Sequence, residues 1–216
     1  MQLMNGGSLY DFIHKKKNTP PPEQRFSWIK DIARGMEFLH SRGIAHRDLK
    51  SANVLLAEDA RKTAMLCDFG TAKQLPRTTI QSTVTGTYRW MAPEIIKGNS
   101  AKINMKCDVF SYSMVLCEIV TLNLPFKDSP SDQMAMIDVV TGKRPALSQP
   151  DPNCPSFLYR LISACWSEDP RDRPSFQEIN LALDSRRFKQ YFVFDTCSEK
   201  MLFVTVHYPL LYTLFF

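Results

Sequence analysis

The sequence predicts a mainly α-helical protein with one short β-hairpin. Apolar residues recur at helical spacing over residues 22–42, and residues 108–120 are apolar almost all round, which is typical of a buried central helix. Two short apolar runs at residues 54–56 and 64–67 flank a charged turn, as in a hairpin of short strands. The long helical segments therefore set the fold class, and the hairpin is an insertion between them.

The composition fits a globular protein. The 216 residues are 44% apolar and 23% charged, which is enough for a sizeable core in one or two units. A net charge of +5 is spread along the chain without a basic stripe among aromatic residues, so we expect no nucleic-acid binding. We interpret the basic run at residues 15–17 as the solvated end of a helix, because cations are favoured there.

The six cysteines form no C-x-x-C pair and no metal-ligand spacing, so we interpret them as reduced thiols of a cytoplasmic protein. The first residues lack a basic segment followed by an apolar core, so no secretory signal is expected. Residues 201–216 are mostly apolar, but this run is shorter than the roughly 20 residues of a membrane span. It also contains His207 and Pro209, and a membrane location is not expected.

Two helices are predicted in the first part of the chain. Ser8 is placed to cap a short amphipathic helix, with Asp11 three residues later as its capping-box partner. Residues 18–22 interrupt it, and a longer helix then runs from Pro22, which suits a first turn, to Gly43. Its apolar stripe is predicted to pack in the core: Phe26, Ile29, Ala33, Met36, and Leu39 or His40.

The run His46-Arg47-Asp48-Leu49-Lys50-Ser51-Ala52-Asn53 precedes the hairpin, and Asp68-Phe69-Gly70 follows it. A hairpin would bring Asn53 close to Asp68 although 15 positions separate them. Two oxygen-bearing side chains would then converge as a divalent cation requires. The carboxylate of Asp48 could accept a proton, so the two runs together contain the parts of a phosphoryl-transfer site.

The rest of the chain adds a polar loop and more helices. Residues 71–87 are rich in hydroxyls, which by composition favours a surface loop: Thr78, Thr79, Ser82, Thr83, Thr85 and Thr87. Asp108 at the start of the apolar helix would need buried partners. Further helices are expected after Pro130, after Pro155 and from Pro174 to Leu183.

Five motifs, in order, resemble the large lobe of the protein-kinase fold over residues 1 to about 187. They are His46-Arg47-Asp48 to Asn53, Asp68-Phe69-Gly70, Ala92-Pro93-Glu94, Asp108 in a buried helix, and Cys165-Trp166 through Asp172-Arg173-Pro174. The resemblance implies a mainly helical lobe with a short β-hairpin at the active site.

This resemblance implies a role for each site residue. Asp48 would orient the substrate hydroxyl and accept its proton, and Lys50 would lie against the transferred phosphate. Asn53 and Asp68 would hold Mg²⁺. The cofactors would be ATP and Mg²⁺, and Leu55 would form the floor under adenine. Met1, Leu3 and Met4, with Gln2, would be hinge residues of the nucleotide site.

Other positions acquire structural roles from the same resemblance. Arg47 would pair with a phosphorylated residue of the hydroxyl-rich loop, which makes that loop a candidate switch. Glu94 and Arg173 would form a buried ion pair, and His46 and Phe69 would be packing elements. Lys50, two residues after Asp48, and Thr87 resemble the serine/threonine class of kinases.

Three segments are similar to the tyrosine-kinase-like group of serine/threonine kinases, and most similar to the transforming-growth-factor-β-activated type of mitogen-activated kinase kinase kinase. They are residues 6–10, 67–72 and 90–94. The subfamily implies a protein substrate such as a downstream kinase kinase, a regulatory adaptor subunit, and signalling in a mitogen-activated kinase cascade.

A complete kinase also has a small lobe with a Gly-rich loop and a strand lysine, and no such motifs precede residue 46. We therefore expect a partial domain at residues 1–187 with little activity alone, and an apolar tail of uncertain structure at residues 188–216. Two alternatives remain open: a fragment of an active kinase, or a catalytically inactive kinase-like interaction module. The tail could be read-through sequence, a segment covering the lobe, or a membrane anchor.

Overall fold

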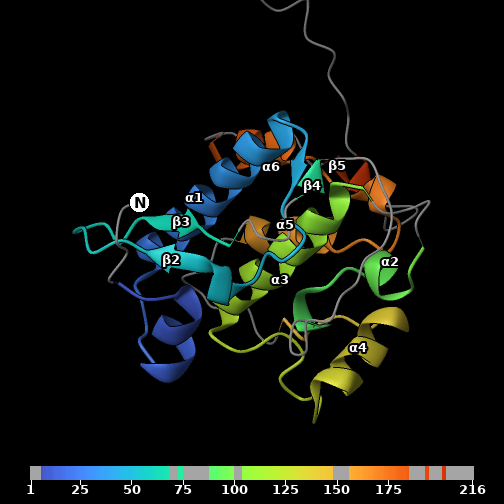
Figure 1. The fold of residues 1–216 in the computed structure, drawn as a ribbon, viewed down its shortest axis with the longest axis horizontal. Coiled ribbons are helices and arrows are strands. Elements are labelled where there is room, and N and C mark those ends of the chain that lie inside the picture. Colours follow the sequence, from blue (N-terminus) through green and yellow to red (C-terminus); the bar gives the residue numbers. More distant parts are fainter. Residues whose placement is uncertain are drawn as a thin grey trace, which may run out of the picture.

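The computed structural model describes residues 6–68, 73–74, 88–99, 104–147, 156–184, 193–194 and 201–202. Helices dominate this part of the chain (Figure 1): α1 (Pro22–Ser41), α2 (Pro93–Ile96), α3 (Lys106–Thr121), α4 (Asp132–Val140), α5 (Ser156–Cys165) and α6 (Phe176–Asp184). Short helical turns connect them: η1 (Asp11–Lys15), η2 (Ser51–Asn53), η4 (Tyr88–Trp90) and η5 (Pro170–Asp172). The predicted mainly helical fold class is confirmed.

The strands form three antiparallel pairs among the described residues. The predicted hairpin is present as β2 (Val54–Leu56) and β3 (Ala64–Leu66), with Val54 opposite Leu66. The strand β1 (Ile44–Ala45) pairs with β4 (Lys73–Gln74), and β5 (Val193–Phe194) pairs with β6 (Met201–Leu202). The pairing of β1 with β4 was not predicted, because a two-residue strand is too short for a periodic signal.

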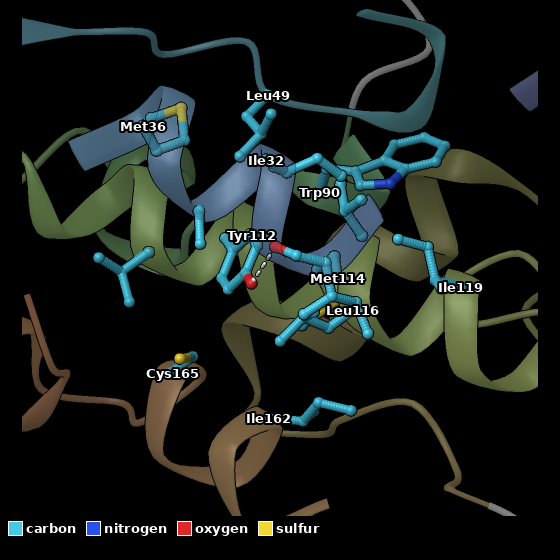
Figure 2. Close-up of a cluster of buried hydrophobic side chains, with 14 of the residues drawn as sticks. Ile32, Met36, Leu49, Trp90, Tyr112, Met114, Leu116, Ile119, Ile162 and Cys165 are labelled. Carbon is cyan, nitrogen blue, oxygen red and sulfur yellow. Dashed lines mark hydrogen bonds between the residues drawn. The ribbon is translucent and has the colours of Figure 1, made fainter. Parts of the chain in front are cut away.

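Helix α3 lies at the centre of the molecule (Figure 1), and every residue from Cys107 to Val120 is buried. This confirms the prediction of a central helix, since a helix that is apolar all round must be covered on every face. Figure 2 shows Tyr112 and Met114 of α3 between Ile32 of α1 and Ile162 of α5. The Tyr112 hydroxyl donates to the backbone oxygen of Ile29 at 2.9 Å, so even this buried polar atom is satisfied.

The helix boundaries follow the predicted capping signals. The Ser8 hydroxyl accepts from the Asp11 N–H at 3.0 Å and donates to the Asp11 carboxylate at 2.9 Å. The same arrangement starts α6, where Glu178 N–H donates to the Ser175 hydroxyl at 3.2 Å. Gly43 follows α1 with a positive φ of 71°, which a glycine adopts at no steric cost. Local chemistry therefore fixes these ends.

A buried ion pair joins α2 to the segment before α6. Arg173 Nη1 and Nη2 donate to the two oxygens of Glu94 at 2.6 and 2.9 Å. The remaining Arg173 N–H groups donate to the backbone oxygens of Ser167, Lys106 and Glu168. The predicted pair is confirmed, and the arginine also donates to three backbone carbonyl groups, so all of its N–H groups have partners.

The sequence predicted two features near the ends of the chain, a basic run at residues 15–17 and an apolar run at residues 201–216. Lys15, Lys16 and Lys17 are exposed, as predicted, and Lys15 pairs with Asp11 one turn earlier at 2.7 Å. No helix in the described part of the chain is long and apolar enough to cross a membrane. The apolar run predicted at residues 201–216 lies outside the described residues, apart from its first two.

Three cysteines in the described core should resist alkylation. Burial raises the pKa of Cys117 to about 12 and also raises the pKa values of Cys107 and Cys165. Because the thiolate is the nucleophile, iodoacetamide at pH 8 should label these three positions only after denaturation. Peptide mass mapping of native and denatured samples measures this. Labelling of any of the three in native protein, at the rate seen in denaturant, would contradict the prediction.

Candidate active site

The predicted site residues Asp48, Lys50 and Asn53 meet in the segment between β1 and β2, which we call the 46–53 loop. Asp48 Oδ2 accepts from Lys50 Nζ at 2.8 Å and from Asn53 Nδ2 at 2.9 Å. Asn53 Nδ2 also donates to the backbone oxygen of Asp48 at 2.8 Å. The side chains of Asp48 and Lys50 are 11% and 18% exposed, so the cluster is desolvated but still open to a ligand.

Asp108 fixes the start of this loop. Its two carboxylate oxygens accept the backbone N–H groups of His46 and Arg47, each at 2.8 Å, and it is fully buried. His40 lies 2.8 Å from Asp108 Oδ2 as a third partner. This confirms the prediction that Asp108 would need partners. Arg47 has a positive φ of 64°, which is unfavourable for a long side chain, and the two bonds to Asp108 hold that conformation in place.

His46 connects the 46–53 loop to the end of the hairpin. Its Nε2 lies 3.2 Å from the backbone oxygen of Cys67, and its Nδ1 lies 3.4 Å from the backbone N of Asp48. A carbonyl only accepts and an amide N–H only donates, so this network assigns the proton to Nε2. His46 is fully buried, as predicted for a packing element, and it ties Asp48 to the residue before Asp68.

The hairpin brings Asn53 and Asp68 to the same end of the sheet. Cys67 N–H donates to the backbone oxygen of Asn53 at 3.0 Å, and Asp68 follows directly, exposed and with φ of 62°. No group of three or more His, Cys, Asp or Glu side chains could hold a metal ion within the described ranges. An amide oxygen and a carboxylate are nevertheless oxygen ligands of the type that Mg²⁺ prefers.

Of the residues predicted to contact adenine or to form the hinge of the nucleotide site, only Leu55 lies in the described part of the chain. Leu55 is half-buried between the buried Val54 and Leu56, and it pairs with Ser8 in an isolated β-bridge. A Cβ on Gly6 would lie 2.2 Å from the Leu56 oxygen, so glycine is required for this close approach. The other predicted nucleotide contacts, Met1, Leu3 and Met4, lie outside the described residues, as does Phe69.

A pocket lies beside Asp48, between the 46–53 loop and the segment after η4. Its lining residues come from the loop, from α3 and from residues 90–95: Arg47, Asp48, Leu49, Trp90, Met91, Ala92, Ile95, Cys107 and Ser111. The Nε of Arg47 is buried and has no hydrogen-bond partner among the described residues. The hydroxyl-rich loop predicted to carry the partner of Arg47 spans residues 71–87, of which only residues 73–74 lie within the described ranges.

Glu118, a second buried carboxylate on α3, was missed by the sequence analysis. Its Oε1 accepts from the Ser51 hydroxyl at 2.5 Å and lies 2.7 Å from His14 Nε2. Its Oε2 accepts from Trp90 Nε1 at 3.0 Å, and Glu118 is fully buried. The available signal was an acidic residue within a helix predicted to be buried on all sides, the same signal that identified Asp108.

Comparison with known proteins identifies relatives of this architecture. The family model of protein tyrosine and serine/threonine kinases matches residues 1–183. Serine/threonine-protein kinase STY46 of Arabidopsis thaliana is 39% identical over 178 residues, covering 82% of this chain and 30% of that protein.

Two further relatives show the same relationship. Dual specificity protein kinase pyk3 of Dictyostelium discoideum is 39% identical over 188 residues, which cover 87% of this chain and 14% of that protein. Serine/threonine/tyrosine-protein kinase HT1 of Arabidopsis thaliana is 37% identical over 207 residues, which cover 95% and 49%. The chain thus spans less than half of each relative's length. With its matched residues and mainly helical fold, this chain belongs to the protein tyrosine and serine/threonine kinase family.

Proposed function

We propose that the chain carries the large lobe of a serine/threonine protein kinase, at residues 1–187, which transfers the γ-phosphate of ATP to protein serine and threonine hydroxyls. The supporting observation is the Asp48 cluster, in which Lys50 and Asn53 both donate to the same carboxylate oxygen. Positioned charge of this kind is what phosphoryl transfer requires, because the protein's contribution is mainly orientation and electrostatic stabilisation.

Asp48 would act on the substrate hydroxyl. Its Oδ2 is occupied by two donors, whereas Oδ1 has no hydrogen-bond partner among the described residues. Oδ1 would therefore orient the attacking hydroxyl and accept its proton. Lys50 lies against the other oxygen of the same carboxylate, Oδ2, and its ammonium would lie against the transferred phosphate.

Asn53 and Asp68 would hold Mg²⁺. The Asn53 amide directs its nitrogen at Asp48, so its oxygen is the end that would coordinate a cation together with the Asp68 carboxylate. Bound Mg²⁺ would neutralise charge that develops on the phosphoryl oxygens. Leu55, half-exposed on β2, would contact adenine, and Met1, Leu3 and Met4 would complete the nucleotide site.

The substrate class and cellular role are further parts of this proposal. Lys50 favours serine and threonine over tyrosine, and the relatives' names include both serine/threonine and dual specificity kinases. We propose a cytoplasmic role in a mitogen-activated kinase cascade, with a downstream kinase kinase as substrate and a regulatory adaptor as partner. Residues 188–216 would lie outside the kinase domain.

A phosphotransfer assay tests the proposal. The chain, alone and joined to a small lobe with a Gly-rich loop and strand lysine, is incubated with Mg²⁺, labelled ATP and a generic protein substrate. We expect label on serine and threonine in the joined form, and loss of that label when the metal is chelated. No transfer in either form would contradict the proposal, and a partner pull-down unchanged by Asp68→Ala would instead favour an interaction module.

Phosphorylation of the hydroxyl-rich loop should control activity. Arg47 has a buried Nε without a described partner, and a phosphate on the loop would supply charge-assisted hydrogen bonds to its guanidinium. Replacing each hydroxyl residue in turn with alanine should lower activity at one or two positions: Thr78, Thr79, Ser82, Thr83, Thr85 and Thr87. Phosphate content by mass spectrometry should fall at the same positions, and full activity in every variant would refute the switch.

A further inference from the structure

Two buried carboxylates on α3 hold the 46–53 loop at two places. Asp108 binds the backbone at His46 and Arg47, and Glu118 binds the hydroxyl of Ser51. The two acids are ten residues apart on one helix, a separation of about 15 Å. Asp48 and Lys50 lie between the two attachment points, so the loop is fixed on both sides of the residues proposed to meet substrate.

Ser51 is directly connected to that cluster. It begins the turn η2, in which Asn53 N–H donates to the backbone oxygen of Lys50 at 2.9 Å. Asn53 then donates through its side chain to Asp48, and its backbone oxygen accepts from Cys67. A shift of Ser51 would therefore move Asn53 relative to both Asp48 and the end of the hairpin.

We propose that Glu118 is a positioning residue for the 46–53 loop and that it acts through Ser51. Its consequence for catalysis rests on the proposed kinase function, whereas its effect on the loop does not. Glu118 also accepts hydrogen bonds from two other segments: from His14 of η1 and from Trp90 of η4. One buried carboxylate thus joins three parts of the chain around the site.

A role in packing alone would have different consequences. Removing Glu118 would leave three bonded groups without their buried acceptor, so either role predicts a loss of stability, and stability does not distinguish the two roles. Only an acceptor at position 118 can hold the Ser51 hydroxyl, and a charged acceptor forms hydrogen bonds roughly twice as strong as a neutral one. The readout must therefore come from the loop itself.

The proposal is tested by amide hydrogen exchange in the full chain. In Ser51→Ala, the amides of Asn53 and Cys67 should exchange about tenfold faster, because their turn has lost its attachment to α3. The amides of His46 and Arg47, which Asp108 holds separately, should stay within a factor of about two. Glu118→Gln should give a smaller rise of about threefold, because the amide keeps the shape without the charge.

Two further variants complete the design. The double variant S51A/E118Q should exceed Ser51→Ala only slightly, because both changes remove the same link. Ser113→Ala is the matched control: Ser113 is also fully buried, on α3, but its hydroxyl donates only to its own helix at Phe110, at 2.6 Å. Unchanged exchange at Asn53 and Cys67 in Ser51→Ala, or an equal rise in Ser113→Ala, would overturn the proposal.

A kinetic measurement separates this inference from the proposed function. In the form that transfers phosphate, Ser51→Ala should lower kcat about tenfold and change KM for ATP much less, since the contacts proposed for adenine do not depend on Ser51. Faster exchange with an unchanged kcat would show that Glu118 holds the 46–53 loop without positioning the residues of the site, and this result would overturn the proposal. If no form transfers phosphate, the proposed function fails, and the exchange data still decide whether Glu118 holds the loop.

Discussion

Asp48→Asn is expected to lower the rate of phosphoryl transfer by a factor of about 10² to 10⁴, the usual contribution of a positioned general base. Lys50 and Asn53 both donate to Oδ2 of Asp48, so an asparagine here would turn its amide oxygen toward them. The amide nitrogen would then occupy the position of Oδ1. That position becomes a donor and can no longer accept the proton of the substrate hydroxyl.

The measurement is kcat with saturating ATP and Mg²⁺, in the form of the chain that transfers phosphate. Asp59→Asn is the matched control, because it also removes one carboxylate but in the exposed turn of the hairpin, where Asp59 accepts from Thr63 at 2.9 Å. The control should stay within a factor of about two, as for most surface substitutions. Equal activities of Asp48→Asn and the control would rule out the assigned role of Asp48.

Arg173→Ala is expected to reduce the free energy of unfolding by about 3 to 5 kcal/mol. Arg173 is 1% exposed, and its loss would leave the 4% exposed Glu94 carboxylate without its bidentate partner. Three backbone oxygens would lose their donor as well. An unpaired buried charge is the costly outcome, because Glu94 would lose the two donors that compensate for its removal from water.

Denaturant unfolding followed by circular dichroism measures this loss. Arg171→Ala is the control, two residues earlier in the same segment: its side chain is 85% exposed and pairs with Asp169 at 2.7 Å. An exposed ion pair contributes about 0 to 1 kcal/mol, so the control should unfold close to the original chain. Similar midpoints for the two variants would show that the Glu94 pair does not stabilise the fold as argued.

Local sequence signals predicted much of this architecture. The apolar stripe of α1 and the continuous apolar run of α3 predicted these helices, because the spacing of apolar residues shows which faces must be buried. Two apolar runs around a charged turn predicted the hairpin, and the register of its strands places Asn53 and Asp68 at the same end. Ser8 marked a helix start through hydrogen bonds that span only three residues.

Other features had no such signal. The bridge between β1 and β4 joins residues about 30 positions apart through two-residue strands, which are too short to show a period. The three donors to Glu118 come from positions 14, 51 and 90, and no spacing rule connects them. The predicted roles of Met1, Leu3 and Met4, and of the hydroxyl-rich loop, remain predictions because these residues lie outside the described ranges.

The sequence by itself determined the helical fold class, the hairpin and the order of the site residues, because these depend on spacing along the chain. Only the tertiary structure decided which oxygen of Asp48 is occupied, and that α3 holds the 46–53 loop through Asp108 and Glu118. Those contacts join groups more than 60 residues apart or depend on a side-chain rotamer. Such contacts arise only when the elements pack, and a linear pattern does not contain them.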